Sequence, residues 1–205
     1  MGNKIVVTGT DTDIGKTIFS AGLVGALGAQ YWKPVQSGLE GETDSQIVAR
    51  LSGRPVLPEA MRLNMPASPH LAAEAEGREI ALADLAPPVV DGPLVIEGAG
   101  GVMVPINRRK TYLDYFADLG APVILCARTQ LGTINHTLLS LRALRDAGCA
   151  VAGVAFIGDA EPDVEQSIVE FGAVRRLGRL GMLDPLRPET LAAEFAAQMD
   201  VTGLL

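Results

Sequence analysis

One stretch near the start of the chain constrains its fold more than any other. A short apolar segment at 4–8 runs directly into the loop sequence GTDTDIGKT at 9–17. The residues that follow Thr17 are mostly apolar and predict a helix that reaches about Leu27. A strand, a glycine-bounded loop and a helix in this order are typical of a phosphate-binding P-loop. Backbone N–H groups at the start of such a helix have no carbonyl partners, so they can bind an anion.

Two side chains of this loop have the chemistry that a nucleoside triphosphate requires. Lys16 is expected to reach the β- and γ-phosphates, and the Thr17 hydroxyl is expected to coordinate Mg²⁺. Five residues separate Gly9 from Gly15, where the usual motif has four, so the loop is of a longer, less common type. The alternative is a chance Gly-Lys-Thr in a strand-to-helix turn, which the agreement between motif and context disfavours.

Apolar segments and helical patterns alternate along the rest of the chain. Strands are predicted at 31–35, 93–97, 122–127 and 151–157, with a weak strand or loop at 179–183. Helices are predicted at 43–51, 70–76, 111–118, 134–144, 164–171 and 191–199. The stretch 55–69 contains four prolines and is interpreted as irregular. Because the strands lack polar alternation, we expect an α/β fold of the P-loop NTPase type, a single domain over residues 1–205 with a mostly parallel sheet flanked by helices on both faces.

Charge and cysteine usage narrow the partners and the compartment. The formal net charge of −7 repels phosphate backbones, so no nucleic-acid partner is expected. No apolar run approaches the length of a membrane span, and Met1 to Lys4 lack a signal-peptide segment, so we expect a cytoplasmic protein with no membrane contact. Cys126 and Cys149 have no metal-like spacing and are predicted to be free, buried thiols in a reducing compartment.

The carboxyl ends of the predicted strands are where a ligand should bind, because parallel α/β sheets hold ligands at that edge. Reactive side chains follow four of these ends, in the loops 9–17, 33–37, 97–101 and 128–135. No arrangement typical of a serine triad, a catalytic thiol or a zinc site is present in the sequence. Chemistry that depends on a nucleotide is therefore the better hypothesis.

Two carboxylates are candidate magnesium ligands. Glu97 ends a predicted strand and can hold Mg²⁺ directly or through water. A solvated or helix-capping glutamate is the alternative, which Gly98 and Gly100 disfavour because they let the backbone approach a ligand closely. Asp44 is a further candidate on the magnesium or phosphate side, although its position alone is typical of a helix N-cap.

Four other polar side chains have both a functional and a structural interpretation. Lys33 can stabilise charge on a phosphoryl group in transfer, or it is a solvated surface lysine. Ser37 is a hydroxyl donor or a turn former. His70 and His136 are interpreted as structural, and their roles stay open.

Several longer strings, in this order along the chain, closely resemble the dethiobiotin synthetase family. The resemblance covers about residues 3 to 157, and the whole length fits. The strings are GTDTDIGKT at 9–17, WKPVQSG at 32–38, SPHLAA at 68–73, EGAGG at 97–101 and LGTINH at 131–136, and the single residue Asp44 also matches.

The resemblance implies an ATP-dependent carboxylase that closes the ureido ring in biotin biosynthesis. In that reaction 7,8-diaminononanoate takes up CO₂ on one amine as a carbamate, and the carbamate oxygen attacks the γ-phosphate of MgATP. The resulting carbamic–phosphoric anhydride is attacked by the second amine, which closes the ring and expels phosphate. The implied enzyme is a carbon–nitrogen ligase that uses Mg²⁺ and takes ATP and CO₂ or bicarbonate as co-substrates.

The resemblance also implies roles for individual residues. Lys16 and Lys33 match catalytic lysines, and Thr17, Asp44 and Glu97 match the magnesium ligands. The implied nucleotide-binding residues are Asp13, Ile14, Gly15, Lys16, Thr17, Ile18, Asp44, Glu97, Gly98, Ala99 and Gly100. The implied substrate-binding residues are Thr12, Lys33, Ser37, Gly132, Thr133, Ile134 and Asn135. Family members are homodimers, and the last four of these residues match a stretch that completes the substrate site of the partner subunit.

One departure from the family pattern concerns the base of the nucleotide. Family members commonly carry an asparagine that reads adenine after the strand that matches 151–157, where this chain has Phe156-Ile157-Gly158-Asp159. We therefore expect looser selectivity among nucleotides.

Two other interpretations stay open at this point. A ParA- or MinD-like nucleotide switch shares the elongated P-loop, although the early lysine of those proteins is absent from Thr10-Asp11-Thr12. An amidase-linked relative that acts on another carboxylate or amine is the third possibility.

Overall fold

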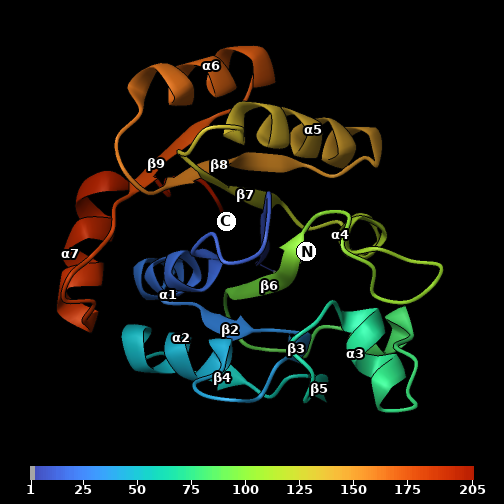
Figure 1. The fold of residues 1–205 in the computed structure, drawn as a ribbon. Coiled ribbons are helices and arrows are strands. Elements are labelled where there is room, and N and C mark those ends of the chain that lie inside the picture. The colour runs from blue at the N-terminus through green and yellow to red at the C-terminus, as the bar shows by residue number, and fades with distance from the viewer. Residues whose placement is uncertain (1–2) are drawn as a thin grey trace.

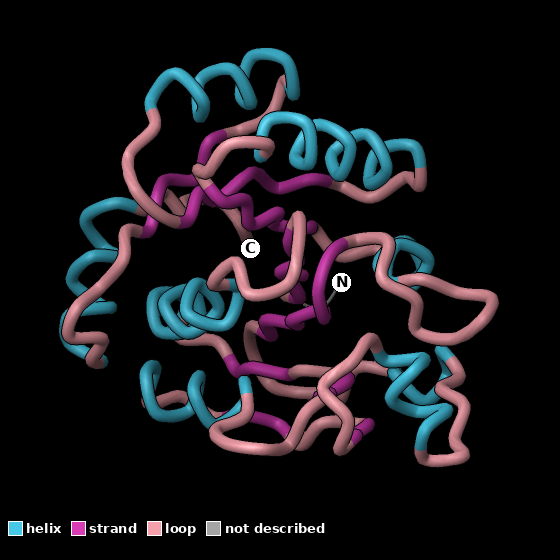
Figure 2. The backbone as a smooth tube through the Cα atoms, in the orientation of Figure 1, coloured by secondary structure: helices cyan, strands magenta, loops and turns pink. Residues whose placement is uncertain are grey.

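The computed structural model describes residues 3–205 and contains a seven-stranded sheet in which neighbouring strands run parallel. Met1 and Gly2, on which part of the expectation about the start of the chain depends, lie outside the described residues. Across the sheet the strands are β4 (Val56–Leu57), β2 (Gln30–Trp32), β6 (Leu94–Gly101), β1 (Lys4–Gly9), β7 (Val123–Arg128), β8 (Val151–Ile157) and β9 (Arg176–Leu180). Figure 1 and Figure 2 show this sheet as one twisted layer through the middle of the molecule. The P-loop strand β1 is therefore central.

Helices cover both faces of the sheet (Figure 1). One face is covered by α1 (Lys16–Leu27), α2 (Asp44–Ser52) and α7 (Pro188–Gln198), and the other by α4 (Tyr112–Leu119), α5 (Thr133–Asp146) and α6 (Pro162–Gly172). Successive residues of β1 contribute to opposite cores, because Ile5 and Val7 pack against α1 while Val6 packs on the other side. The predicted α/β class, with a mostly parallel sheet flanked by helices, is confirmed.

The predicted continuous strand at 31–35 is wrong. β2 ends at Trp32, and the chain leaves the main sheet through Lys33 and Pro34, because proline has no N–H to donate to a ladder. The next strand, β3 (Val35–Ser37), pairs in parallel with β5 (Met61–Leu63) as a separate two-stranded sheet. A short helix, α3 (Pro69–Ala75), and a 3₁₀ turn, η1 (Leu82–Leu85), follow in the chain.

Three smaller expectations also need correction. The stretch 55–69 is not wholly irregular, since it holds β4 and β5, which are too short to give a periodic signal. β6 continues through the glycines to Gly101, which pairs with Gly9, and β9 ends at Leu180 rather than running over 179–183. Both thiols are free, but only Cys126 is buried and Cys149 is half-buried. None of the helices within residues 3–205 is long and apolar enough to cross a bilayer.

Glycines on α1 make the packing of this helix testable. A Cβ added at Gly22 would lie 2.2 Å from the Phe195 ring, which is 2% exposed, whereas one added at Gly25 would meet nothing within 4 Å. Replacing Gly22 with alanine is expected to lower the free energy of unfolding by about 1–2 kcal/mol, because overpacking outweighs the gain in helix propensity.

Gly25→Ala is the matched control for this substitution. It gains the helix propensity without the clash, so it is expected to raise stability by about 0.5–1 kcal/mol. Urea unfolding of the two variants checks the opposite signs, and equal shifts would show that α7 does not pack on α1 as described.

Candidate active site

The P-loop has the backbone conformation that an anion site requires. α1 begins after Gly15, whose φ of 91° is a left-handed conformation that favours glycine. No side chain within residues 3–205 caps this end of α1, so the N–H groups of its first turn remain available to an anion. Lys16 is 6% exposed, and its ammonium donates to the carbonyl of Asp11 at 2.8 Å. Burial lowers the pKa of Lys16, and the nearby Lys33 cation adds to this effect.

A fully buried carboxylate, Glu97, lies at the centre of the site. Glu97 Oε1 accepts from Thr17 Oγ1 at 3.1 Å and from Lys33 Nζ at 3.2 Å. Glu97 Oε2 accepts from the Tyr31 hydroxyl at 2.9 Å. Burial, reinforced by the Glu97 charge, raises the pKa of Tyr31 well above its ordinary value, so the phenol remains a donor. The structure therefore brings together β6, the start of α1 and the end of β2.

Lys33 lies between two carboxylates. Its ammonium forms ion pairs with Asp44 and with Glu97, and the residue is 4% exposed. Burial by itself would lower the pKa of Lys33, but the two carboxylates outweigh it and raise that pKa. Burial likewise opposes the charged form of Asp44, yet Lys33 holds the pKa of Asp44 below its ordinary value. The surface-lysine interpretation is therefore wrong, and this lysine is a buried cation.

The position of Asp44 in the sequence is typical of an N-cap, but Asp44 does not cap α2. The N-cap is Thr43, whose N–H donates to Gln46 Oε1 at 2.8 Å while its hydroxyl accepts from the Gln46 N–H at 3.4 Å. This reciprocal capping leaves the Asp44 side chain, one residue later, free to reach Lys33.

One cavity, of about 450 Å³, is bounded by these groups. Ser37 also lines this cavity, and its buried hydroxyl oxygen has no hydrogen-bond partner among the described residues. We call this cavity the reaction cavity. The predicted site residues that line it are Thr12, Asp13, Ile14, Gly15, Lys16, Thr17, Lys33, Ser37, Asp44, Glu97, Ala99 and Gly100.

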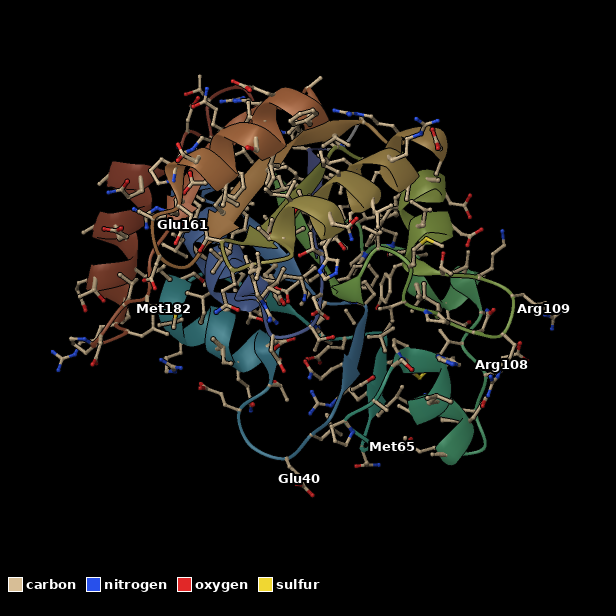
Figure 3. The ribbon with its side chains drawn as sticks, turned by 45° about the horizontal axis from the view of Figure 1, so that its top comes forward. Glu40, Met65, Arg108, Arg109, Glu161 and Met182 are labelled. Atoms are coloured by element: carbon tan, nitrogen blue, oxygen red, sulfur yellow. The ribbon has the colours of Figure 1, made fainter. Side chains whose placement is uncertain are left out.

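A second cavity, of about 610 Å³, lies on the other side of the P-loop, and we call it the base cavity. Its walls come from Asp13, Ile14, Gly15 and Ile18 of the loop and α1, and from the ends of β8 and β9. Glu161 and Met182 line it and lie on the same side of the molecule in Figure 3, whereas Met65 lies on the opposite side. The two cavities share Asp13, Ile14 and Gly15, so together they form one elongated site.

Some predicted residues are not brought into either cavity. Gly98 contributes its carbonyl, which lies 3.4 Å from Lys33 Nζ, but it does not line the described walls. The stretch 132–135 forms the start of α5 and lies outside both linings. His70 Nδ1 lies 3.1 Å from Ser68 Oγ, and His136 lies within α5, away from both cavities.

Tyr31 and Arg128 are among the residues of the site that the sequence-based prediction did not include. Tyr31 is in an apolar strand and looked like an ordinary core residue, because nothing local signals a partner 66 positions later. Arg128 lines the base cavity and donates to the Thr12 carbonyl at 2.6 Å. Its place at the end of β7 was the available signal, since that loop follows a strand end at the ligand edge.

The chain matches known proteins over nearly its whole length. A family model described as AAA domain matches residues 3–190. The chain is 62% identical to the ATP-dependent dethiobiotin synthetase BioD of Rhodopseudomonas palustris, covering 94% of this chain and 93% of that protein. It is 57% identical to the protein of the same name from Brucella anthropi, covering 98% and 96%.

Solved structures with the same fold are much more distant in sequence. The cell division ATPase MinD of Pyrococcus furiosus aligns with a TM-score of 0.56 at 15% identity, over 95% of this chain and 89% of that one. A ParA family ATPase of Chlorobium tepidum aligns with a TM-score of 0.55 at 9% identity, over 95% and 90%. At these identities the likeness shows the fold alone.

Proposed function

From the family to which the chain belongs, the ATP-dependent dethiobiotin synthetases within the AAA domain family, we propose how its residues carry out the reaction. Enzymes of this kind are ligases that form carbon–nitrogen bonds in biotin biosynthesis. One observation carries the proposal: the buried Lys33 ammonium and the P-loop lysine Lys16 line the same cavity. A site with two cations beside free helix N–H groups suits a triphosphate and an anionic acceptor.

The reacting groups follow from the family reaction. 7,8-Diaminononanoate takes up CO₂ on one amine as a carbamate, whose oxygen attacks the γ-phosphorus of ATP while the bond to the β-phosphate oxygen breaks. ADP leaves, and a carbamic–phosphoric anhydride remains. The second amine attacks the carbonyl carbon, phosphate departs, and the amine loses its proton as the ring closes.

Individual side chains have distinct parts in these steps. Lys16 neutralises the β- and γ-phosphates, because phosphoryl transfer depends on positioning and charge stabilisation rather than on a protein nucleophile. Lys33 binds the carbamate and stabilises the charge that develops between it and the γ-phosphate. Thr12 and Ser37 bind the diamine. Both residues line the reaction cavity, and the Ser37 hydroxyl has no partner among the described residues, which supports this role.

The oxygen atoms around Thr17 fit a magnesium ion. Thr17 Oγ1 and Glu97 Oε1 are 3.1 Å apart, and Asp44 lines the same cavity. Within residues 3–205 no group of three or more acidic, histidine or cysteine side chains forms a metal site alone, but Mg²⁺ usually keeps water and phosphate oxygens among its ligands. When bound, the ion neutralises and orients the phosphate oxygens. Thr17, Asp44 and Glu97 would hold it, and Lys33 shares the two carboxylates with it.

Relaxed nucleotide selectivity is the expected consequence of Gly158, which lines the base cavity where the family pattern has an adenine-reading asparagine. ATP, CTP and GTP are expected to support turnover within about tenfold of one another, because a side-chain hydrogen bond to the base is missing. Steady-state kinetics with each nucleotide tests this. A preference for ATP of about a hundredfold or more would contradict it.

A homodimer would complete the substrate site. The stretch 132–135 lies outside both cavities of its own chain and forms the start of α5. The Thr133 N–H donates to the Gln130 carbonyl at 3.1 Å, and the other N–H groups of this helix start suit a substrate carboxylate. Leu131 is fully exposed and Leu139 is 62% exposed, which supports a partner surface on this part of α5.

Subunit mixing tests this arrangement. Lys33→Ala and Asn135→Asp homodimers are each expected to be inactive, because each lacks one half of both sites. Mixed and exchanged, they are expected to recover up to about a quarter of the wild-type rate, since half of the dimers contain one intact site. If subunit exchange is verified and activity does not recover, Asn135 and Lys33 of one active site must belong to the same subunit.

An assay of ADP release, with and without the diamine and bicarbonate, tests the proposed reaction. ADP release is expected to depend on both compounds. Release without the diamine would favour a nucleotide switch, and release with another amine would favour a different ligase.

We also propose a cytoplasmic location, which the free thiols Cys126 and Cys149 support.

A further inference from the structure

Tyr31 has a polar contact inside an otherwise apolar layer. It lies opposite Val95 in the pairing of β2 with β6, so its side chain and that of Glu97, two residues beyond Val95, are on the same face of the sheet. Its neighbours on that face include Ile5, Val7 and Phe19. Both Tyr31 and Glu97 are 0% exposed, and their hydrogen bond measures 2.9 Å.

The two oxygens of the Glu97 carboxylate have different surroundings. Oε1 faces the reaction cavity side, where Thr17 and Lys33 donate to it. Oε2 faces the core, where among the described residues Tyr31 is its donor. A carboxylate buried in apolar surroundings is strongly destabilised if one of its oxygens lacks a hydrogen-bond donor. Without the phenol, the Glu97 carboxylate would therefore rotate and turn Oε2 toward other donors.

We propose that Tyr31 is a positioning residue, whose hydroxyl holds the rotation of the Glu97 carboxylate so that Oε1 is presented to Thr17 and the P-loop. Tyr31 lines neither of the two cavities, so it acts through Glu97. The inference rests on the proposed function, in which Glu97 helps to hold the divalent cation.

The test compares two substitutions that each remove one buried phenol hydroxyl. Tyr31→Phe removes the donor to Glu97, and Tyr115→Phe removes a donor to the Leu85 carbonyl at 2.8 Å, in the core on the opposite face of the sheet. Calorimetric titration gives the affinity for ATP with Mg²⁺ and with a chelator, and thermal unfolding of the free proteins gives their stabilities.

Tyr31→Phe is expected to reduce the gain in ATP affinity from Mg²⁺ by about tenfold, as is common when a group that orients a metal ligand is removed. Its affinity without the metal is expected to stay within about twofold of wild type, because no phosphate contact changes. Tyr115→Phe is expected to lose thermal stability to a similar degree but to keep the full effect of Mg²⁺. Replacement of Tyr31 by p-aminophenylalanine, which retains a donor, is expected to restore most of that effect.

Glu97→Gln separates failure of this inference from failure of the proposed function. If Glu97→Gln loses the magnesium effect while Tyr31→Phe keeps it, Tyr31 does not position Glu97 and the cation site stands. If both variants keep it, Glu97 is not a cation ligand, and the inference about Tyr31 falls with that role. If Tyr31→Phe weakens ATP binding equally with and without Mg²⁺, the hydroxyl has a general structural role and the inference is overturned.

Discussion

Lys33→Ala is expected to lower turnover about a thousandfold while it weakens nucleotide binding by less than about tenfold. The asymmetry follows from the position of the ammonium. Lys33 is buried and pairs with Asp44 and Glu97. In the proposed reaction it faces the place where charge develops, so it would contribute mainly in the transition state. Single-turnover kinetics and equilibrium ATP binding measure the two effects separately. Unchanged turnover would remove Lys33 from the mechanism.

The stability of this variant has to be measured together with its activity. Without the ammonium, the buried Glu97 carboxylate and the half-buried Asp44 carboxylate would lack their cation, which is expected to cost about 3–5 kcal/mol of unfolding free energy. Lys33→Met keeps the apolar part of the side chain and provides a second version of the test. Lys110→Ala is the control, because this exposed lysine pairs with Asp114 on the surface and is expected to leave turnover unchanged.

Lys16→Ala is expected to abolish nucleotide-dependent turnover, with a loss of at least about a thousandfold, and also to weaken ATP binding strongly. It differs from Lys33→Ala in this second effect, because the P-loop lysine is expected to contact the phosphates in the ground state as well as in the transition state. ATP titration and the ADP-release assay measure the two losses. A Lys16→Ala enzyme with near-normal ATP affinity would show that the P-loop binds the triphosphate mainly through its backbone.

The contrast between these two lysines also separates binding from chemistry in the proposed reaction. Lys16 is in the loop itself, and its pKa is lowered by burial, whereas the carboxylates around Lys33 raise the pKa of that residue. Lys33 therefore stays a cation across the ordinary range of assay conditions. If activity falls as the pH rises but is still below the ordinary pKa of lysine, a group other than Lys33 must be losing its proton.

The local parts of the site could be predicted from the sequence alone. The P-loop occupies contiguous residues, and its anion site depends on backbone N–H groups and on Gly15, so strand, loop and helix could be read in order. Glu97 could be predicted because the apolar residues of its strand stop there, although β6 itself continues to Gly101. The alternation of apolar strands with helices likewise indicated the parallel sheet.

Pairs that are distant in the chain could not be predicted in this way. The strand predicted at 31–35 was wrong because β3 pairs with β5, a partner of three residues in a proline-rich stretch. The position of Asp44 left two interpretations open, a ligand and an N-cap. Only the folded chain shows that Thr43 caps α2 and that the Asp44 side chain pairs with Lys33.

The phosphate-binding loop, the class of fold and the family could be inferred from the chain alone, because these depend on neighbouring residues and on the order of motifs. The burial of the Lys33 cation and the hydrogen bond from Tyr31 to Glu97 arise only in the folded protein. Those properties come from desolvation and from hydrogen bonds across the sheet, between β2 and β6, which residues far apart in the chain form only after folding.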